Sequence, residues 1–433
     1  MESFVKLLGQ DNPLIKPIEN RGFEIPSEIQ EKSIPVILEG KDVIAGAATG
    51  SGKTLAFVAG LIKNVRKGYG LQGLVLTPTR ELAVQITNEF LDFSKYMNFN
   101  VLSVYGGVSI DNQIRLLKEA EIVVGTPGRI LDCINKNSIN LTRINTLVLD
   151  EADMMFDMGF IKDVEKIISN CPKARQTLLF SATITREIVK LSEKHMKNAI
   201  EISAELHVDP KKLEQVYYDV DDNLKYSLLK HLLENEKSKL VMIFCNTRKN
   251  VDFVANNLRF MGIDAVQLHG GFPQSKRNRF LEKFNAKKVN ILVATDVAAR
   301  GLDIKGVSHI YNYDIPLTKN EYIHRIGRTA RAGKEGKVIN ILTNRHYENF
   351  KDIIKSKEFN IINEKTPFIK KVMLRWMPGK KDERNRRRKN IGHERKNWSR
   401  RDRNERRDAG GNDYRGREGR KIKRKSGYWS KPY

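Results

Sequence analysis

Short runs rich in β-branched and aliphatic residues recur along most of the chain, separated by helix-like stretches. Between residues 40 and 205 they read DVIA, GLVLT, NVLSVY, EIVVGT, TLVLD and TLLFSAT, and further on KLVMIFCNT, DAVQLHG, NILVATD, SHIYNY and KVINIL. Such runs are typical of strands buried in a parallel sheet, with crossover helices between them. The sequence therefore predicts two similar α/β domains in tandem.

The length of 433 residues agrees with two domains and an additional segment. Between the two series, SAELHVDPKK is polar, contains a proline and lacks apolar periodicity. We therefore expect a first domain at residues 1–203, a linker at 204–212 and a second domain at 213–365. Residues 366–433 form a C-terminal tail.

The tail is strongly basic. From residue 370 to 433 the sequence holds 25 Lys and Arg against 8 Asp and Glu, which is +17 of the formal charge of +25. All three tryptophans also lie there, among few aliphatic residues. We expect a disordered tail, because this composition cannot bury a core. The charge favours a polyanionic partner, either nucleic acid or an acidic membrane surface.

A membrane is the weaker of these two partners. No apolar run approaches the ~20 residues that span a bilayer, and MESFVKLLGQDN lacks the features of a signal peptide. We therefore expect a cytoplasmic protein. Cys133, Cys171 and Cys245 lie far apart without C-x-x-C spacing, so we expect reduced core residues and no disulfide framework or zinc site.

A glycine-rich turn follows the first strand. AATGSGKT, residues 47–54, leads into the apolar stretch LAFVAGLI, and strand, glycine-rich turn, Lys-Thr and helix is an arrangement that binds phosphates. Lys53 would reach the β- and γ-phosphates, and the Thr54 hydroxyl would bind Mg²⁺. Ala47 replaces the first glycine of the strict pattern. The alternative interpretation is an accidental glycine-rich turn.

Two carboxylates end the strand TLVLD. Asp150 and Glu151 would lie at the C-terminal edge of the sheet, beside the phosphate turn. Asp150 is expected to hold Mg²⁺, and Glu151 to orient or deprotonate the attacking water. An acidic helix N-terminus is the alternative interpretation.

Seven motifs in this order resemble the DEAD-box family of ATP-dependent RNA helicases. They are AATGSGKT, PTRELA (78–83), TPGR (126–129), DEAD (150–153), SAT (181–183), TDVAARGLD (295–303) and HRIGRTARAG (324–333). The resemblance covers roughly residues 1–365. It implies an α/β fold of two tandem RecA-like parallel-sheet domains that bind ATP, Mg²⁺ and RNA.

The resemblance also implies a nucleotide site. GFEIPSEIQ (22–30) resembles the family's Q motif, in which Gln30 would read the adenine edge and an aromatic would pack near the base. Asp303 is similar to a residue that meets the ribose. The residues expected to bind nucleotide are Phe4, Phe23, Gln30, Ala47, Ala48, Thr49, Gly50, Ser51, Gly52, Lys53, Thr54 and Asp303.

Catalysis and coupling are assigned in the same way. Planar cations from the second domain suit charge on the γ-phosphate. The expected catalytic residues are Lys53, Asp150, Glu151, Arg328 and Arg331, and the expected coupling residues are Asp153, Ser181, Thr183 and His324. Without the first-domain motifs, these arginines and the histidine would be read as members of surface ion pairs, and Gln30 as a surface glutamine.

RNA is expected at the turns that follow the strands of both domains. Backbone N–H, hydroxyl and guanidinium groups there can hold phosphates and sugars without reading bases. The expected RNA-binding residues are Thr79, Arg80, Gly107, Thr126, Arg129, Gln274, Arg277 and Thr295. Each alone is weak evidence, since Gly-Gly and Thr-Pro-Gly are ordinary turn formers.

Two positions depart from the family pattern. Glu28 stands where the family often has proline, and Ala330 where it usually has glycine. Ala330 would matter only if its backbone requires a positive φ. We expect a helical φ there and no effect.

The predicted function is an ATP-dependent RNA helicase or RNA chaperone that clamps RNA between two domains and locally unwinds short duplexes. The tail interleaves Arg with Trp, Tyr and Gly, which suits phosphate contacts and stacking on unpaired bases. A solubilising tail or a localisation signal is the alternative for this segment. For the whole chain, the alternatives are a nonenzymatic RNA-annealing protein and a DNA-directed helicase.

Overall fold

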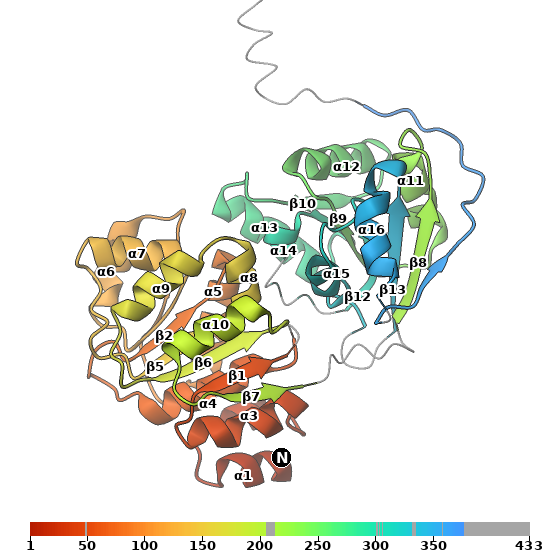
Figure 1. Ribbon diagram of the computed structural model, residues 1–433. Coiled ribbons are helices and arrows are strands. Elements are labelled where there is room, and N and C mark those ends of the chain that lie inside the picture. Colours follow the sequence, from red (N-terminus) through yellow and green to blue (C-terminus); the bar gives the residue numbers. More distant parts are fainter. Residues whose placement is uncertain are drawn as a thin grey trace, which may run out of the picture. The chain divides into compact units, whose positions relative to one another are not determined.

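The described chain contains two parallel sheets, each with its own helices (Figure 1). The computed structural model describes residues 1–47, 50–204, 213–299, 302, 304, 306–330, 335–356 and 358–375. Residues 1–375 form one compact unit. Residues 376–433, most of the predicted linker and four predicted site residues lie outside the described residues. These four are Ala48, Thr49, Asp303 and Arg331.

The first domain is built on a seven-stranded sheet with the order β3-β4-β2-β5-β6-β1-β7. All of its neighbouring strands are parallel. The strands are β1 (Val43–Gly46), β2 (Gly73–Leu76), β3 (Val101–Val104), β4 (Ile122–Gly125), β5 (Thr146–Leu149), β6 (Gln176–Ser181) and β7 (Ile200–Ser203).

The second sheet has the order β10-β11-β9-β12-β13-β8-β14 and is also parallel throughout. Counted from the first strand of each domain, both orders are the same. The strands are β8 (Leu213–Asp219), β9 (Leu240–Phe244), β10 (Ala265–Leu268), β11 (Ile291–Ala294), β12 (Val307–Asn312), β13 (Gly336–Leu342) and β14 (Ile361–Asn363). The prediction of two similar α/β domains is confirmed.

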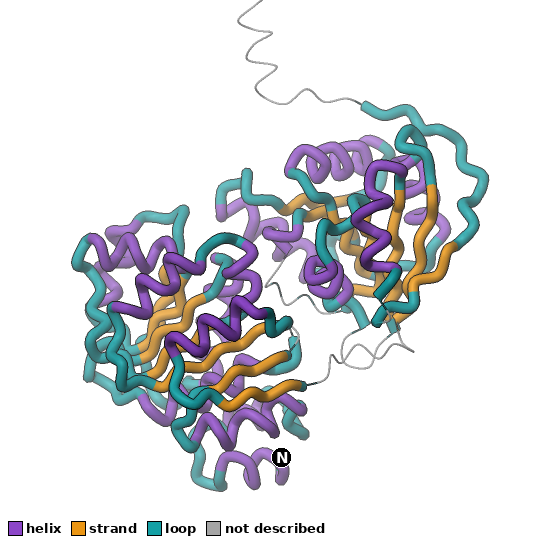
Figure 2. The backbone as a smooth tube through the Cα atoms, viewed as in Figure 1, coloured by secondary structure: helices purple, strands orange, loops and turns teal. Residues whose placement is uncertain are grey.

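Helices cover both faces of each sheet (Figure 2). The first domain has α1 (Glu2–Leu8), α2 (Ile15–Asn20), α3 (Glu28–Leu38), α4 (Lys53–Asn64), α5 (Arg80–Phe93), α6 (Ile110–Leu117), α7 (Pro127–Asn135), α8 (Ala152–Asp157), α9 (Ile161–Ser169) and α10 (Arg186–His195). The second has α11 (Lys225–Asn235), α12 (Arg248–Phe260), α13 (Gln274–Asn285), α14 (Asp296–Ala299), α15 (Lys319–Ile326), α16 (Tyr347–Ile354) and the 3₁₀ turn η2 (Asn344–His346).

The apolar runs are continuous because the strands are buried on both faces. Successive side chains of a strand point to opposite faces of the sheet. In β1, Val43 and Ala45 belong to one apolar cluster and Ile44 to another. This is the burial expected of a parallel sheet covered by helices on both sides.

Three strands, β7, β8 and β14, were not among those expected from the apolar runs. All three lie at the same end of the strand order: β7 is the last strand of the first sheet, and β8 and β14 are the last two strands of the second. Most residues of β7 and β14 are exposed, and buried and less buried residues alternate in the first part of β8. Strands with this burial, at the sheet edge or next to it, have no continuous apolar run by which the sequence could predict them.

The second domain ends later than residue 365, the boundary expected from the sequence. Residues 366–375 form a C-terminal strap that lies along α11 and α12. The backbone N–H of Val372 donates to the Ser227 hydroxyl (3.1 Å), and that of Arg375 donates to Asn257 Oδ1 (2.8 Å). These ten residues were assigned to the tail because their exposed side chains, Lys370, Lys371 and Arg375, are basic like the tail. Ile369 and Val372 nevertheless pack against the core of the second domain.

The expectation of a helical φ at Ala330 is wrong. Its φ is +53°, in the left-handed region, and its side chain is buried. A Cβ is unfavourable there by about 1–2 kcal/mol, so the glycine usual in the family suits this backbone better than alanine does.

Replacing Ala330 with glycine should therefore leave the free energy of unfolding unchanged or raise it by up to about 1 kcal/mol, since relief of backbone strain offsets the lost methyl group. In a helix interior the same exchange costs about 1 kcal/mol. Ala255→Gly, in the interior of α12, is the matched control and should destabilise. Denaturant unfolding measures the stability of both variants. An equal loss of unfolding free energy in the two would contradict the proposed backbone strain at Ala330.

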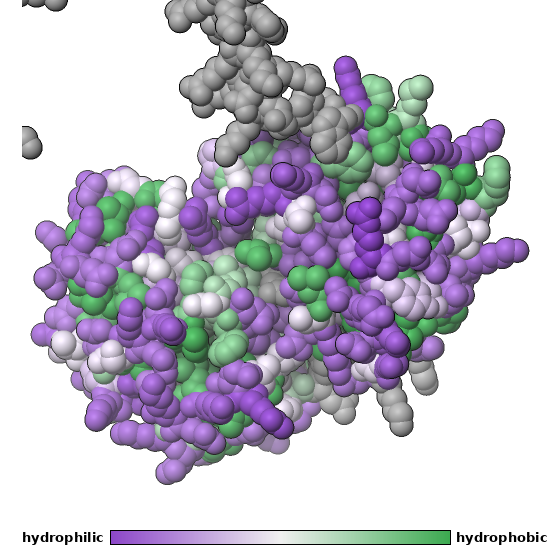
Figure 3. All heavy atoms as spheres, turned by 45° about the horizontal axis from the view of Figure 1, so that its top comes forward, coloured by the Kyte–Doolittle hydropathy of each residue, from purple (hydrophilic) through white to green (hydrophobic). Residues whose placement is uncertain are grey.

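The surface drawn in Figure 3 is largely hydrophilic, and the three cysteines lie in the core as the sequence predicts. Hydrophilic side chains dominate the face drawn in Figure 3, with small hydrophobic groups between them. None of the helices among the described residues is long and apolar enough to cross a bilayer. Cys133, Cys171 and Cys245 are buried free thiols.

Candidate nucleotide and RNA sites

The glycine-rich turn connects β1 to α4 and is anchored on both sides. The backbone N–H of Ala47 donates to the Ser181 carbonyl (2.9 Å) at the end of β6. Gly52 precedes α4 with a φ of +91°. A Cβ on Gly52 would lie 2.4 Å from Gln30 Nε2, so only glycine fits. Lys53 and Thr54 are the first two residues of α4, where backbone N–H groups are free for an anion.

The segment before α3 holds this turn in place. The Ser27 hydroxyl donates to the Ser51 carbonyl (2.7 Å), and Gln30 Nε2 donates to the Gly52 carbonyl (3.0 Å). Gln30 Oε1 accepts from the Ser27 backbone N–H (3.0 Å), which completes a capping box. Gln30 is therefore buried against the phosphate turn, and the surface-glutamine alternative does not apply. Glu28 is the first residue of α3, a position that suits an acidic residue as well as proline.

Lys53, Asp150 and Glu151 meet in a buried cluster. Lys53 Nζ lies 3.0 Å from Glu151 Oε1 and 3.8 Å from Asp150 Oδ1. Burial opposes the charge on Lys53, but the neighbouring carboxylates outweigh it and raise the lysine pKa. Burial raises the pKa of Asp150, which Lys53 opposes and Glu151 reinforces. Asp150 Oδ1 accepts no hydrogen bond from the described residues.

Glu151 adopts a backbone conformation that is rare for its residue type. Its φ and ψ are +53° and +52°, and it is the residue directly before α8. A left-handed residue with a Cβ costs of order 1–3 kcal/mol and occurs at sites where the surrounding structure enforces it. Here the turn directs the Glu151 carboxylate toward Lys53.

The four predicted coupling residues also meet. Asp153 Oδ2 accepts hydrogen bonds from the backbone N–H and the hydroxyl of Thr183 (3.0 and 2.9 Å), and the Ser181 hydroxyl accepts from the Asp153 backbone N–H (3.2 Å). His324 Nε2, from α15, lies 3.3 Å from Asp153 Oδ2. Burial alone would raise the pKa of Asp153, but His324, Lys53 and Thr183 outweigh it and hold that pKa below its ordinary value.

Arg328 is buried in the second domain. Its side chain is 2% exposed, and Nη1 donates to the Leu302 carbonyl (2.7 Å) and Nε to the His324 carbonyl (3.3 Å). Both of these bonds lie within the second domain, so the proposed role of Arg328 at the γ-phosphate stays a prediction.

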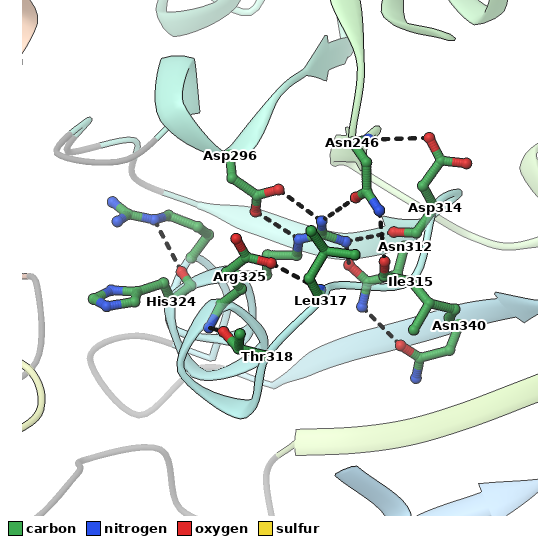
Figure 4. Close-up of polar contacts among 12 residues, drawn as sticks. Asn246, Asp296, Asn312, Asp314, Ile315, Leu317, Thr318, His324, Arg325 and Asn340 are labelled. Carbon is green, nitrogen blue, oxygen red and sulfur yellow. Dashed lines mark hydrogen bonds and ion pairs between the residues drawn. The ribbon is translucent and has the colours of Figure 1, made fainter. Parts of the chain in front are cut away.

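The neighbouring Arg325 was not among the predicted site residues and is the centre of a polar network (Figure 4). It is 1% exposed. Nε and Nη2 donate to the two carboxylate oxygens of Asp296 (2.6 and 2.7 Å), Nη1 donates to Asn312, and Nη2 donates to Asn246. Arg325 therefore connects α15, which carries His324, with the turn after β9, the end of β12 and the start of α14.

The two predicted aromatics of the nucleotide site lie in different environments. Phe4 is 1% exposed and packs in the core with α3, so it supports the first domain from within rather than offering an accessible ring. Phe23 is 38% exposed. Only Phe23 presents a face on which a base could stack.

The RNA-binding residues predicted in the first domain follow β2, β3 and β4. The Thr79 side chain caps α5 by accepting from the Leu82 backbone N–H, and Thr126 is the residue before α7. The Arg80 guanidinium lies against Gly107, where a Cβ would be 1.9 Å from Arg80 Nη1, so this close approach requires glycine. Arg129 donates to Gln113 Oε1 (2.8 Å) and to the Val108 carbonyl (3.1 Å).

In the second domain, Gln274 and Arg277 both contact a carboxylate. Gln274 Nε2 lies 2.6 Å from Glu81 Oε1, and Arg277 Nη2 lies 2.9 Å from Glu81 Oε2. Thr295 follows β11, and its carbonyl accepts from the backbone N–H groups of Ala298 and Ala299. The structure therefore pairs two predicted RNA-binding side chains with Glu81, a residue of the PTRELA motif.

Comparison with known proteins decides which family has this arrangement. Residues 27–191 match the DEAD/DEAH box helicase family, and residues 224–333 match the helicase conserved C-terminal domain. The DEAD-box ATP-dependent RNA helicase CshA of Geobacillus kaustophilus is 42% identical over 370 residues, which span 84% of this chain and 79% of the relative. The chain belongs to the DEAD-box family.

Other DEAD-box relatives give the same result. The ATP-dependent RNA helicase CshA of Listeria monocytogenes is 47% identical over 335 residues, which span 76% of this chain but only 64% of that protein. The solved structure of S. cerevisiae Dbp5 bound to RNA and ADP BeF3 has a TM-score of 0.77 at 30% identity, covering 84% of this chain and 96% of that one. These comparisons confirm the resemblance and the two tandem RecA-like domains.

The shared strand order identifies second-domain residues that correspond to the predicted RNA-binding residues Thr79, Arg80 and Gly107. The sequence motifs did not indicate them. Thr247 caps α12 as Thr79 caps α5, and Arg248 approaches Gly270 as Arg80 approaches Gly106 and Gly107. Both sets follow the second and third strands of their sheets. The repeated Thr-Arg and Gly-Gly pairs were present in the sequence, but only the matching topology shows that they are equivalent in this DEAD-box chain.

Proposed function

We propose that this chain is an ATP-dependent RNA helicase that binds RNA on both domains and separates short duplexes locally, coupled to ATP hydrolysis. The observation that carries the proposal is the buried cluster in which Lys53 Nζ lies 3.0 Å from Glu151 and 3.8 Å from Asp150, at the start of α4. A lysine for phosphates and carboxylates for the metal and the water are the groups that phosphoryl transfer requires.

Each residue has a distinct role in this proposal. Lys53 binds the β- and γ-phosphates, Glu151 orients or deprotonates the attacking water, and Gln30 reads the adenine edge. Arg328 and Arg331 stabilise charge on the γ-phosphoryl group. Asp303 contacts the ribose.

We propose Mg²⁺ as the cofactor, held by Thr54 and Asp150. Asp150 Oδ1 accepts no hydrogen bond from the described residues and the pKa of Asp150 is raised, which fits a carboxylate whose charge a cation would stabilise. Mg²⁺ keeps several waters and uses few carboxylates, which agrees with a site of one hydroxyl and one carboxylate. When bound, the ion would neutralise charge between the phosphates.

RNA is proposed to contact the turns that follow the strands, through Thr79, Arg80, Gly107, Thr126 and Arg129 and their second-domain counterparts. These groups suit phosphates and sugars, so the binding would be largely independent of sequence. Intact Lys53, Asp150 and Glu151 argue against a nonenzymatic annealing protein. A cytoplasmic location stays a prediction.

The proposal is tested by strand separation with ATP on RNA duplexes of increasing length. Local opening without long translocation predicts efficient separation of short duplexes and a steep fall as length increases. A rate independent of duplex length would contradict the clamp, and no separation with ATP would contradict the helicase activity.

The basic segment 376–433 is proposed to tether RNA, and its deletion is expected to weaken RNA binding. It holds 22 Lys and Arg against 8 Asp and Glu. The slope of log K against log salt is about −0.7 per neutralised phosphate on single strands, so deletion should flatten the salt dependence. Saturated kcat should change little, because the proposed catalytic residues lie upstream.

A truncation after Arg375 is the appropriate variant, since an earlier end would remove the C-terminal strap. A second variant, with Trp398 and Trp429 replaced by alanine, should weaken binding to unpaired RNA by about 1–3 kcal/mol per stacked base. RNA titrations at several salt concentrations measure both effects. If the titration curves of the truncated and full-length proteins are identical, RNA binds to the two domains alone and the tail does not contribute.

A further inference from the structure

Helix α2 ends in a turn that fixes the backbone of Phe23. Gly22 has a φ of +68°. The backbone N–H of Phe23 donates to the Ile18 carbonyl (3.3 Å), and that of Gly22 donates to the Glu19 carbonyl (2.9 Å). These two bonds form a Schellman motif, whose left-handed position favours glycine. The turn therefore places Arg21 and Phe23 in a defined relation to each other.

The side chains of Arg21 and Phe23 meet on the same buried ring. Arg21 Cζ lies 4.4 Å from the centre of the Phe93 ring, and the ring centres of Phe23 and Phe93 are 6.5 Å apart, with their planes tilted by 40°. Phe93 is the last residue of α5 and belongs to the core. The half-exposed ring of Phe23 is thus supported by a buried ring on which a guanidinium lies.

Further contacts fasten α2 to the end of α5. Arg21 pairs with Asp92, and Lys16 Nζ lies 5.0 Å from the centre of the Tyr96 ring. Asn20 Nδ2 donates to the Tyr96 hydroxyl (3.1 Å). Exposed ion pairs contribute little stability by themselves. Their effect here is geometric, because they hold the turn at Gly22 on a rigid helix end.

The same segment reaches the phosphate turn at its other end. Phe23 begins the stretch in which Ser27 and Gln30 bond to the carbonyls of Ser51 and Gly52. An exposed aromatic face beside a phosphate-binding turn can stack on a planar base. The phosphate-binding turn and the exposed ring therefore belong to one continuous, anchored segment.

We propose that Arg21 is a positioning residue for the nucleotide base: through Phe93 it fixes the ring of Phe23, on which the base stacks. This inference rests on the proposed ATP site and adds a residue outside the motifs that define it. Arg21 should affect the base and not the phosphates, because its contacts among the described residues, Phe93 and Asp92, lead to Phe23 and not to Lys53.

The test compares two ligands on the full-length protein, ADP and pyrophosphate, by titration calorimetry. Arg21→Ala should weaken ADP binding by about 3- to 10-fold, which is the range of one aromatic or cation–π contact. Pyrophosphate affinity should not change, since pyrophosphate has no base. Lys6→Ala is the control, because it removes an exposed cation from α1 without changing any contact assigned to the Arg21 side chain or the Gly22 turn. Its affinities for ADP and for pyrophosphate should both equal those of the native protein.

A double-mutant cycle shows whether Arg21 acts through Phe23. In a Phe23→Ala background, Arg21→Ala should have no further effect on ADP affinity. Unchanged ADP affinity in the single variant, equal losses for ADP and pyrophosphate, or full additivity in the double variant would each overturn the proposal. Failure of the native protein to bind ADP would instead contradict the proposed function.

Discussion

Replacing Arg328 with alanine should lower kcat for RNA-stimulated ATP hydrolysis by about 10³-fold. A guanidinium that stabilises charge on the transferring phosphoryl group contributes an effect of at least this size. RNA affinity measured without nucleotide should change little, because the proposed target is present only with ATP. Steady-state hydrolysis at saturating ATP and RNA measures the loss.

The burial of Arg328 requires a control for folding. Its side chain donates to the carbonyls of Leu302 and His324, and an unpaired buried acceptor costs about 1–3 kcal/mol. Arg345→Ala removes an exposed arginine of the same domain that pairs with Asp222, and it should keep native turnover. If Arg328→Ala retains native RNA affinity and kcat within about tenfold of native, the assignment of Arg328 is wrong.

Replacing Glu151 with glutamine should reduce ATP hydrolysis by at least about 100-fold, because a positioned general base contributes about that much. Glutamine keeps the size of the side chain but cannot accept the proton. ATP and RNA binding should persist, so an RNA-bound state should accumulate. Single-turnover hydrolysis and RNA retention during a chase measure the two effects.

A carboxylate of the same domain provides the comparison for Glu151. Glu165→Gln alters α9, where Glu165 pairs with Lys194 at the surface, and should leave hydrolysis unchanged. If Glu151→Gln hydrolyses ATP near the native rate, Glu151 is not the general base. A parallel loss of ATP affinity would show that the side chain serves binding through Lys53 rather than catalysis.

The phosphate turn and the carboxylates were predictable because each motif is local. A strand, a glycine-rich turn and a Lys-Thr pair at a helix start determine the position of Lys53 without distant information. The order of strands then brings Asp150 and Glu151 to the same edge. The pairing of Asp153 with Thr183 was implied only by resemblance, since thirty residues separate them.

Other features depend on contacts that no sequence pattern carries. Arg325 looked like any arginine near a helix end, and its partners Asp296, Asn312 and Asn246 come from a helix start, a strand end and a turn that lie far apart in the sequence. The left-handed backbone at Ala330 could not be predicted from the residue type, because alanine favours the right-handed helical conformation. The C-terminal strap was missed because exposed lysines alternate with its inward side chains.

The most direct test of the central claim is the rate of ATP hydrolysis by the native full-length protein with single-stranded RNA and with DNA of matched sequence. An ATP-dependent RNA helicase predicts strong stimulation by RNA and little by DNA, with saturation as RNA is added. Equal stimulation by both nucleic acids would indicate a DNA-directed or unspecific helicase. Hydrolysis that neither nucleic acid changes would contradict the coupling of the ATP site to RNA.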